Sequence, residues 1–462
     1  MAIYNLLDAI DVFKNIGFIL LALLVLMIMI TVHEFGHYIV GKLLKFKINE
    51  FAIGMGPAIF KHKAKNGELF SIRIFPFGGY CSFEGEDEEN PSPNAFNNKK
   101  PWQRILVLLA GATMNYLLAL LIIIISMNVY GQSTFGAAII KPSDGVYAEM
   151  SLRGGDYVTS IEKDGRRTSI FLTTDLVSAL NHSKAGDEIK AEVIRDGKKI
   201  FVPVKLRSDV ECYNMTEIEK VYDSLGVGSA IRISSTDKFP FKTGDFITRF
   251  KDADEPTECS LIFGTDDLVK FISPLLEGDI ASFYVSRDGV RTEITFTLGE
   301  GWNAVDKTNS AAVLDFLGIA VEGKSYYTQG SYQKVGFFTS LLRSVEYSFK
   351  IGGTIFRSLG ELLTGKLGLN AVGGTITTIR TASKVMSYGL VYAFEIMAFI
   401  GVNLAVFNLL PIPALDGSKI VFCIIEWIRK KPINRKVEAV IHLVGFVLIL
   451  GFAVLVDVLQ FI

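Results

Sequence analysis

Four long apolar stretches interrupt a chain of 462 residues that is otherwise mixed in character. A helix of about 20 consecutive apolar residues is long enough to cross the hydrocarbon core of a bilayer. The pattern therefore predicts four membrane-spanning helices. They cover residues 16–40, 105–129, 390–410 and 440–461.

A long segment between the second and third stretches carries an internal repeat. Its shared units end in Arg-Asp-Gly turns flanked by alternating apolar residues, which is typical of β-hairpins. The paired units are Gly155-Asp156-Tyr157-Val158-Thr159 with Gly244-Asp245-Phe246-Ile247-Thr248, Gly186-Asp187 with Gly278-Asp279, and Arg195-Asp196-Gly197 with Arg287-Asp288-Gly289. We therefore predict two copies of one small, β-rich α+β domain.

Two shorter segments complete the pattern. Residues 68–80 alternate partly like a strand and follow a turn at Asn66-Gly67, so they predict a membrane-associated β-hairpin after the first span. Residues 331–360 mix apolar positions with frequent charges. Such charges argue against a fifth span and favour amphipathic helices on the membrane surface.

Basic residues predict the orientation of the four helices. Ten Lys or Arg lie between Lys42 and Arg104, and six lie in the loop after the third stretch, whereas the N-terminus offers only Lys14. Because cytoplasmic loops are enriched in Lys and Arg, both connecting loops should be cytoplasmic. The two termini and residues 131–389 should lie outside. The first stretch lacks a small-residue cleavage site, so we interpret it as a retained helix and not as a signal peptide.

Composition agrees with a membrane protein that also has soluble parts, since 50% of residues are hydrophobic and 21% are charged. A formal net charge of −1 gives no overall attraction to nucleic acid. Four cysteines without a Cys-x-x-Cys pair exclude a disulfide scaffold. Cys212 and Cys259 both lie in the predicted outer part, and the sequence leaves open whether they pair.

The strongest chemical signal is His33-Glu34-Phe35-Gly36-His37, at the end of the first apolar stretch. On a helix, two imidazoles four residues apart face one side and can hold Zn²⁺, with Glu34 beside the metal as a candidate general base. The alternative is a chance match at a polar helix end. Ionisable residues inside a membrane are costly, which favours a functional site.

Asp416 is the candidate third ligand. The first and third spans run in the same direction, so the segment Pro411-Ile412-Pro413-Ala414-Leu415-Asp416-Gly417 should reach a depth similar to that of the histidines. A catalytic zinc needs three protein ligands and one open position. An ordinary turn at a helix end is the alternative. Asn403 and Asn408 are candidates for binding substrate backbone or a developing oxyanion, and helix–helix contact is the other explanation.

These motifs resemble the site-2 intramembrane metalloproteases, in particular their bacterial branch that includes the regulator-of-sigma-E protease. The resemblance covers nearly the whole chain, in matching order and spacing, although the second span and residues 370–374 depart from the usual glycine-proline patterns. Besides the two motifs above, it rests on Phe51-Ala52-Ile53-Gly54-Met55-Gly56-Pro57, Phe75-Pro76-Phe77-Gly78-Gly79-Tyr80, and Leu109-Ala110-Gly111 with Asn115.

The resemblance implies a set of roles. His33, His37 and Asp416 would be zinc ligands, and Glu34 the catalytic base. The hairpin would lend a strand edge to an unwound substrate, with a plain cytoplasmic hairpin as the alternative. The candidate substrate-binding residues of this hairpin are Ser71, Arg73, Phe75, Gly78 and Gly79. The resemblance gives no counterpart to His442 or His62, so we do not expect them to bind metal, and no role is assigned to Glu395.

The repeated domains resemble a tandem pair of PDZ domains, which bind extended C-terminal peptides. The loops at residues 145–154 and 228–233 lack the expected small-residue pattern, so a purely steric gate is the alternative to peptide capture. The predicted organisation is 1–41 (N-terminus and first span), 42–101 (cytoplasmic loop with β-hairpin), 102–131 (second span), 132–206 and 207–300 (PDZ-like domains), 301–387 (amphipathic helices and linker), 388–410 (third span), 411–437 (Asp416 motif and cytoplasmic loop) and 438–462 (fourth span).

Together these features predict a zinc-dependent intramembrane endopeptidase of a bacterial inner membrane. By resemblance, its substrates would be single-pass membrane proteins trimmed beforehand by another protease, such as an anti-sigma factor, or remnant signal peptides. Membrane lipid would surround it, and no nucleic acid partner is expected. A catalytically silent scaffold and a zinc carrier are the competing classes. The intact Glu34 and ligand set argue against the scaffold. A carrier would place polar residues along several helices.

Overall fold

The computed structural model describes residues 2–86, 91–132, 135–137, 139–141, 145–195, 197–236, 240–251, 259–287, 290–325, 327–329, 334–369 and 372–460. The chain divides into two compact units. One unit joins Met1–Val129 to Gly336–Ile462, and the other is the inserted segment Tyr130–Val335.

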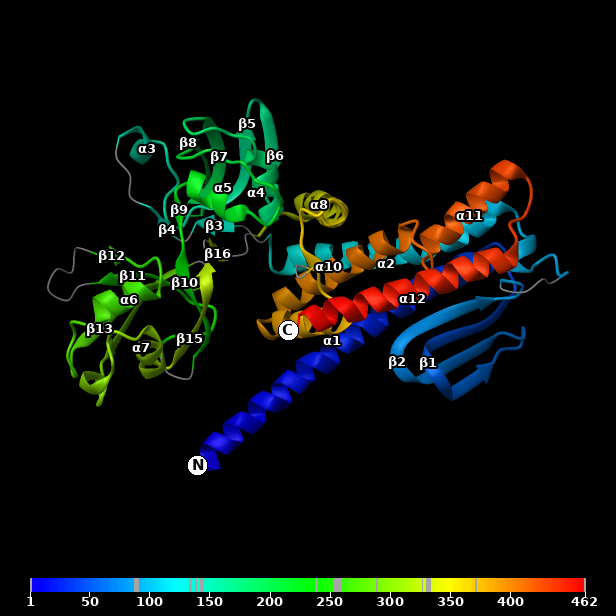
Figure 1. Ribbon diagram of the computed structural model, residues 1–462, viewed down its shortest axis with the longest axis horizontal. Coiled ribbons are helices and arrows are strands. Elements are labelled where there is room, and N and C mark those ends of the chain that lie inside the picture. Colours follow the sequence, from blue (N-terminus) through cyan, green and yellow to red (C-terminus); the bar gives the residue numbers. More distant parts are fainter. Residues whose placement is uncertain are drawn as a thin grey trace. The chain divides into compact units, whose positions relative to one another are not determined.

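The first unit contains the four predicted membrane spans. Within the described residues, four helices are long and apolar enough to cross a membrane: Ile16–Leu43, Pro101–Val129, Leu390–Leu409 and Lys436–Leu459. They belong to α1 (Ala2–Leu43), α2 (Pro101–Val129), α10 (Leu390–Leu409) and α12 (Arg435–Leu459) (Figure 1). The prediction of four spans is confirmed, and the protein is a polytopic helical membrane protein with β-rich parts.

Helix α2 packs against both α1 and α10. Small residues allow this close approach, because a side chain at Gly36 would lie 2.4 Å from the Ala110 carbonyl oxygen and one at Gly401 would lie 2.9 Å from Ala119. α2 starts at Pro101, a favourable first helical residue since its missing N–H would have no partner there.

The predicted hairpin is part of a larger sheet. This sheet consists of β1 (Ile48–Lys63) and β2 (Leu69–Phe83). Both strands bend at glycines with φ between 82° and 85°, namely Gly54, Gly56 and Gly78. Because of these bends, residues 50–53 pair on one side with 69–72 and on the other with 79–82. Residues 79–83 therefore form an edge of the sheet.

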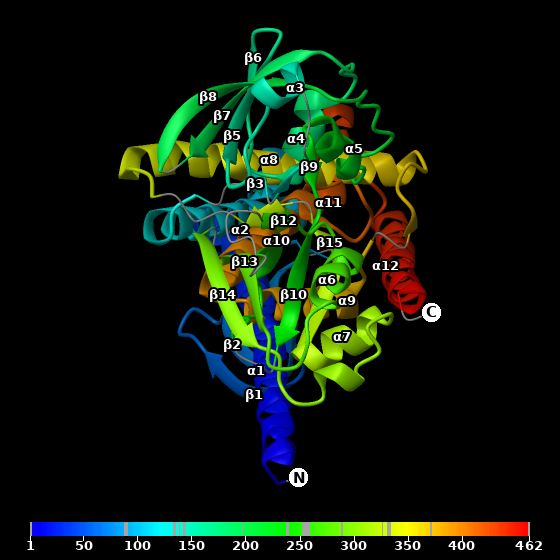
Figure 2. The same cartoon turned by 90° about the vertical axis from the view of Figure 1, so that its left-hand side faces the viewer.

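Three further helices and one short turn complete this unit: α8 (Phe337–Leu363), α9 (Thr375–Ser387), α11 (Asp416–Arg429) and η1 (Phe96–Asn98). α8 is one long helix (Figure 2), and it is not among the four candidate spans. Its buried face carries Ser340, Ser344 and Ser348. Asn128 Nδ2 of α2 donates to Ser340 Oγ at 2.7 Å, so hydrogen bonds help hold α8 to α2.

Two six-stranded sheets, antiparallel in every described strand pairing, form the inserted unit together with short helices. The first sheet contains β3 (Phe135–Ala137), β5 (Tyr157–Lys163), β6 (Arg166–Ser169), β7 (Glu188–Arg195), β8 (Lys198–Lys205) and β16 (Tyr327–Gln329). The second contains β10 (Ala230–Thr236), β11 (Phe246–Lys251), β12 (Cys259–Leu261), β13 (Ile280–Arg287), β14 (Val290–Thr297) and β15 (Ile319–Ser325). The remaining elements are β4 (Ile139–Ile140), β9 (Val227–Gly228), α3 (Val146–Glu149), α4 (Thr173–Leu180), α5 (Ile218–Ser224), α6 (Thr265–Ile272), α7 (Ser310–Leu317) and η2 (Trp302–Ala304).

The sequence repeat corresponds to repeated contacts. Asp156 is buried and accepts from Arg195 Nε and Nη2, both at 2.6 Å. Its counterpart Asp245 accepts from Arg287 Nε and Nη2 at 2.8 and 2.7 Å. Each pair joins the start of one strand to the end of a neighbouring strand. Asp196, Asp288 and Gly289 lie outside the described residues.

The hydrophobic cores place the domain boundaries later than predicted. The first core extends through Val210 to Val227, and the second runs from Ile231 to Ile319. Boundaries at 206 and 300 would cut off α5 and β9 from the first core and α7 and β15 from the second. These boundaries are therefore corrected. Short closing elements belong to each domain because their apolar side chains fill its core.

The cysteine pairing that the sequence left open is not formed. All four cysteines are free. Cys212 packs against the first core and donates to the Glu217 carbonyl oxygen at 3.5 Å, whereas Cys259 begins β12 of the second sheet. The two residues belong to different domains of the insertion.

We expect Arg195→Met to destabilise the inserted unit by about 3 kcal/mol, because it leaves the buried Asp156 carboxylate without its cation. Lys141→Met is the control. Lys141 Nζ lies 2.7 Å from Asp223 Oδ1, and both side chains are about half exposed, so its loss should cost less than about 1 kcal/mol. Limited proteolysis of the full chain along a urea series measures both changes. Equal sensitivity of the two variants would contradict the expectation.

Candidate metal centre

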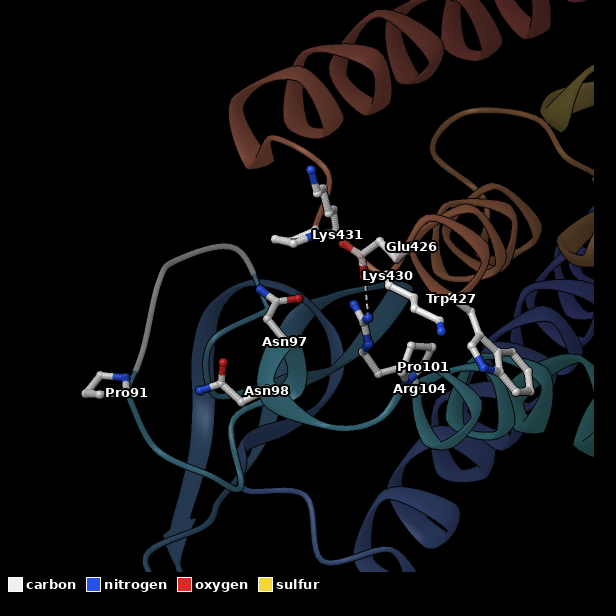
Figure 3. Close-up of a pocket in the computed structure, with 10 residues that line it drawn as sticks. Pro91, Asn97, Asn98, Pro101, Arg104, Glu426, Trp427, Lys430 and Lys431 are labelled. Carbon is white, nitrogen blue, oxygen red and sulfur yellow. Dashed lines mark hydrogen bonds and ion pairs between the residues drawn. The ribbon is translucent and has the colours of Figure 1, made fainter.

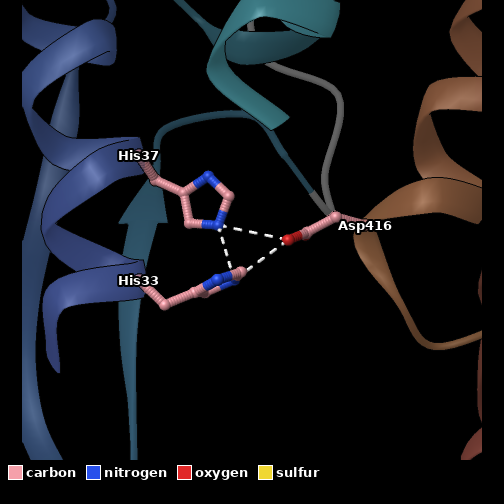
Figure 4. A group of neighbouring side chains, drawn as sticks. All are labelled: His33, His37 and Asp416. Atoms are coloured by element: carbon pink, nitrogen blue, oxygen red, sulfur yellow. Dashed lines mark hydrogen bonds and ion pairs between the residues drawn. The ribbon is translucent and has the colours of Figure 1, made fainter. Parts of the chain in front are cut away.

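His33 and His37 lie one turn apart on α1 and point toward Asp416, the first residue of α11 (Figure 4). His33 Nε2 lies 3.0 Å from Asp416 Oδ2, and His37 Nε2 lies 3.3 Å from the same oxygen. The two Nε2 atoms are 3.1 Å apart. The structure thus joins the three predicted ligands, which come from opposite ends of the chain.

This cluster fits a zinc ion. Tetrahedral zinc holds nitrogen and oxygen ligands at about 2.0–2.1 Å, which places neighbouring ligand atoms about 3.3 Å apart. The three observed separations lie at or just below that value. Three protein ligands leave a fourth position open, which is the arrangement of catalytic zinc and not of structural zinc.

Backbone contact sets the tautomer of His37. Its Nδ1 lies 2.8 Å from the carbonyl oxygen of Val107 on α2. Because a carbonyl only accepts, Nδ1 must carry the proton, and Nε2 presents its lone pair to the metal position. Helix α2 also needs a residue without a side chain where it faces the two histidines. A side chain at Gly111 would lie 2.4 Å from His37 Nε2.

Asn115 of α2 holds the second imidazole. His33 Nδ1 lies 3.4 Å from the amide nitrogens of both Asn115 and Asn408. Among the described residues, the buried Asn115 Oδ1 has no hydrogen-bond partner. Turning this amide would let Oδ1 accept from His33 Nδ1–H and leave Nε2 for the metal. No role was predicted for Asn115, although an amide within an apolar span is a signal of one.

Two prolines and a close contact shape the loop that carries Asp416. α10 ends at Leu409, before Pro411 and Pro413, as the sequence predicts. Ala414 adopts φ of 78°, a conformation unusual for a residue with a side chain. A side chain at Gly417 would lie 2.2 Å from the Leu410 carbonyl oxygen, so Asp416 is followed by a residue that must be small.

His442 of α12 stabilises this loop. Its Nδ1 accepts a hydrogen bond from the Ala414 N–H at 3.0 Å. Gly445, one turn along α12, lets the helix approach Pro413 closely. The contact of His442 with this loop was not predicted from the sequence.

Glu34 lies where the helix meets the β-sheet. Its Oε2 accepts from the backbone N–H of Cys81 at 2.9 Å. A side chain at Gly79 would lie 3.6 Å from the Glu34 Cγ. The edge segment 79–83 thus runs past the glutamate and directs at least one outward N–H toward it. Burial raises the pKa of the Cys81 thiol, which keeps it protonated.

The predicted substrate-binding residues fall into two groups. Gly78 forms the bend before the edge segment, and Phe75 is exposed on the sheet. Ser71 and Arg73 instead face Glu50 within the sheet, at 2.6 Å and 2.7 Å from its Oε1.

Tyr80 also donates to Glu50, at 2.9 Å. Burial raises the pKa of Glu50, but the hydrogen bonds from Ser71, Arg73 and Tyr80 outweigh it and hold the pKa below its usual value. This carboxylate therefore stays charged and cross-links both halves of β2. The buried Oδ1 of Asn403 has no hydrogen-bond partner among the described residues.

The fold and site define a membrane metalloprotease class. The sequence profile of peptidase family M50 matches residues 21–452, and the chain belongs to this family. The enzyme is a zinc metalloendopeptidase.

Relatives of known name match almost end to end. The regulator of sigma E protease of Haemophilus influenzae is 26% identical, over 95% of this chain and 97% of its own. The regulator of sigma-E protease RseP of Escherichia coli is 26% identical, over 93% and 96%. A candidate zinc metalloprotease of Thermotoga maritima is 29% identical, over 93% and 95%. The resemblance predicted from the motifs is confirmed.

We expect His442→Ala to slow proteolysis about tenfold or more, because residues that orient a ligand contribute that much to zinc sites. His442→Asn should recover most of the rate, since its Oδ1 can occupy the place of Nδ1 and accept from Ala414 N–H. Zinc retention and cleavage rate are measured for both variants. If alanine and asparagine behave alike, the hydrogen bond is not what His442 contributes.

Proposed function

We propose that this enzyme hydrolyses peptide bonds inside the transmembrane segments of single-pass membrane proteins. The observation that carries the proposal is the position of the ligands: His33 and His37 are buried within the apolar helix Ile16–Leu43. Ionisable residues at such depth are expensive and mark a functional site. A protease for soluble proteins would not need its ligands there.

In this proposal His33, His37 and Asp416 bind zinc, and Glu34 is the general base. When bound, the metal would supply a water of lowered pKa and would polarise the substrate carbonyl. Glu34 would hold the proton that the attacking water loses and would later deliver it to the leaving amine. The Cys81 N–H fixes one carboxylate oxygen of Glu34, which leaves the other for the proton transfer.

The edge segment 79–83 is suited to hold the substrate. A transmembrane helix hides its carbonyl groups in internal hydrogen bonds, so it must unwind before hydrolysis. An unwound segment can add as a strand to a sheet edge. Gly79 and the bend at Gly78 keep this edge open beside Glu34. Asn408, close to His33, is the better placed of the two asparagines to stabilise an oxyanion.

The rest of the sheet supports a location against the membrane. Several large apolar side chains of the two strands are exposed, more than a water-facing hairpin of this size would show. They are Met55, Ile59, Phe60, Ile72, Ile74 and Phe75.

The insertion acts as a substrate filter in this proposal, on the outer side of a bacterial inner membrane. Its two domains are PDZ-like. The sequence predicted a binding loop at residues 228–233, but most of this segment belongs to β10, which is flanked by β11 and β15 and offers no free edge. β15 is one of the two end strands of the path β14-β13-β11-β10-β15, and it is the edge next to β10 to which a peptide would add. A steric gate requires no such binding.

The names of the relatives suggest the substrate class. Two of them are regulators of sigma E, which supports anti-sigma factors, already trimmed by another protease, as substrates. Remnant signal peptides share the same features, a single span and no bulky outer domain.

The experiment uses purified enzyme in lipid nanodiscs and two tagged single-pass substrates, one with a folded outer domain and one without. A third substrate lacks the outer domain and carries leucines in place of the helix-breaking residues of its span. We expect fast cleavage of the short substrate only, since the outer domain is excluded and a stable helix resists unwinding. Cleavage of all three at one rate would contradict the proposal, as would cleavage of a soluble peptide alone.

A further inference from the structure

One pocket of the first unit is lined by residues other than the three of the metal-ligand cluster. Its volume is about 990 Å³, which is large enough for a lipid headgroup or another small ligand. Figure 3 shows the residues that surround it, from the start of α2, the end of α11 and the turns beside them. They are Pro91, Asn97, Asn98, Pro101, Arg104, Glu426, Trp427, Lys430, Lys431 and Pro432.

The charges of this pocket favour an anion. Arg104, Lys430 and Lys431 provide three cations, against the single carboxylate of Glu426. Glu426 is already engaged: one oxygen pairs with Arg104 Nη2, and the other accepts from the Ile433 N–H at 3.0 Å. It is therefore poorly placed to neutralise the lysines as well.

Arg104 adds an unused donor. The residue is only 5% exposed, and its Nε has no hydrogen-bond partner among the described residues. A buried donor of this kind is costly unless a ligand or water reaches it. Pro101, the first residue of α2, also lines the pocket, so the positive end of the α2 helix dipole lies beside it. Arginine near a helix N-terminus is a typical arrangement for phosphate recognition.

The surroundings match the membrane interface. Pro101 begins a candidate span, so the pocket lies at the end of a transmembrane helix. Trp102, Trp427 and Ile428 are exposed beside it. Tryptophan is enriched where hydrocarbon meets headgroups, and basic clusters next to spans attract anionic lipids.

We propose that this pocket binds the phosphate group of an anionic glycerophospholipid. The phosphate would lie between Arg104 and the two lysines, and the acyl chains would extend along the exposed apolar residues. A soluble phosphate ester shares the same recognition chemistry but lacks the chains. Neither the metal centre nor the route of the substrate is needed for this binding.

The test is native mass spectrometry of the delipidated full chain with equal amounts of phosphatidylglycerol and phosphatidylcholine. We expect selective retention of phosphatidylglycerol. The double substitution Lys430→Gln and Lys431→Gln should weaken this retention roughly 30-fold. Each basic residue near the membrane surface raises the affinity for anionic lipid about fivefold. Both lysines are exposed, so the fold should survive. Lys61→Gln with Lys63→Gln removes two exposed lysines of β1 and should leave retention unchanged.

Glycerol 3-phosphate in a parallel experiment distinguishes the two sources of phosphate. If the ester displaces the bound lipid only at high ester concentrations, the site is assigned to phospholipid. Binding of the ester but not of the lipid would overturn the lipid assignment. Equal retention of the two lipids, or unchanged retention in the Lys430/Lys431 variant, would overturn the proposal altogether. Thermal denaturation of each variant shows whether lost binding reflects lost folding.

Discussion

Asp416→Ala is expected to remove zinc retention and proteolysis together. Asp416 is the ligand that α11 supplies in the proposed site, and its Oδ2 lies within 3.3 Å of both histidine Nε2 atoms. Without it, two imidazoles of one helix remain, which is too few for a catalytic zinc site. Since even residues behind the ligands change zinc affinity 10–100-fold, we expect the affinity to fall by more than about 100-fold.

Zinc content after gel filtration, beside cleavage of a single-pass substrate, measures both effects of Asp416→Ala. Glu300→Ala removes an exposed carboxylate from the inserted unit and is the control. A variant that keeps its zinc and loses only activity would show that Asp416 acts on the substrate and not on the metal. Full zinc and full activity would remove Asp416 from the site.

Glu34→Gln is expected to keep zinc while slowing hydrolysis by about 10²–10⁴-fold, the contribution of a well-placed general base. Glutamine fills the same space, and its carbonyl can still accept from the Cys81 N–H. Single-turnover cleavage and zinc content are measured on one preparation. Loss of zinc together with activity would mean that Glu34 supports the site structurally. A rate close to that of the wild type would exclude it as the base.

The grouping of His33, His37 and Asp416 was predictable because most of the information for it is local. His33 and His37 face one side of any helix, whatever the rest of the fold. Asp416 required one further step, since the direction of the spans brings it to a similar depth. The contacts behind the ligands were not predictable. Asn115 and His442 reach the site only through the rotation of α2 and α12 about their own axes, which an apolar sequence does not reveal.

The β-sheet beside Glu34 shows the same limit. Gly54, Gly56 and Pro57 usually weaken strands, so periodicity favoured a hairpin around residues 68–80. In the structure the strands bend at these glycines, which lets residues 50–53 pair on both sides.

The cores of the inserted domains extend beyond the predicted domain boundaries for a related reason. The repeat motifs end at hairpins, whereas the cores are closed by short elements such as α5 and β15 that carry weak patterns.

The most direct test of the central claim is to locate the bond that the enzyme cleaves. Purified enzyme in nanodiscs is incubated with a tagged single-pass substrate, with and without a zinc chelator, and the products are weighed by mass spectrometry. We predict one cut inside the transmembrane segment, absent with chelator and restored by added zinc. A cut only in the flanking soluble sequence, or one that persists in the chelator, would contradict intramembrane zinc proteolysis by this chain.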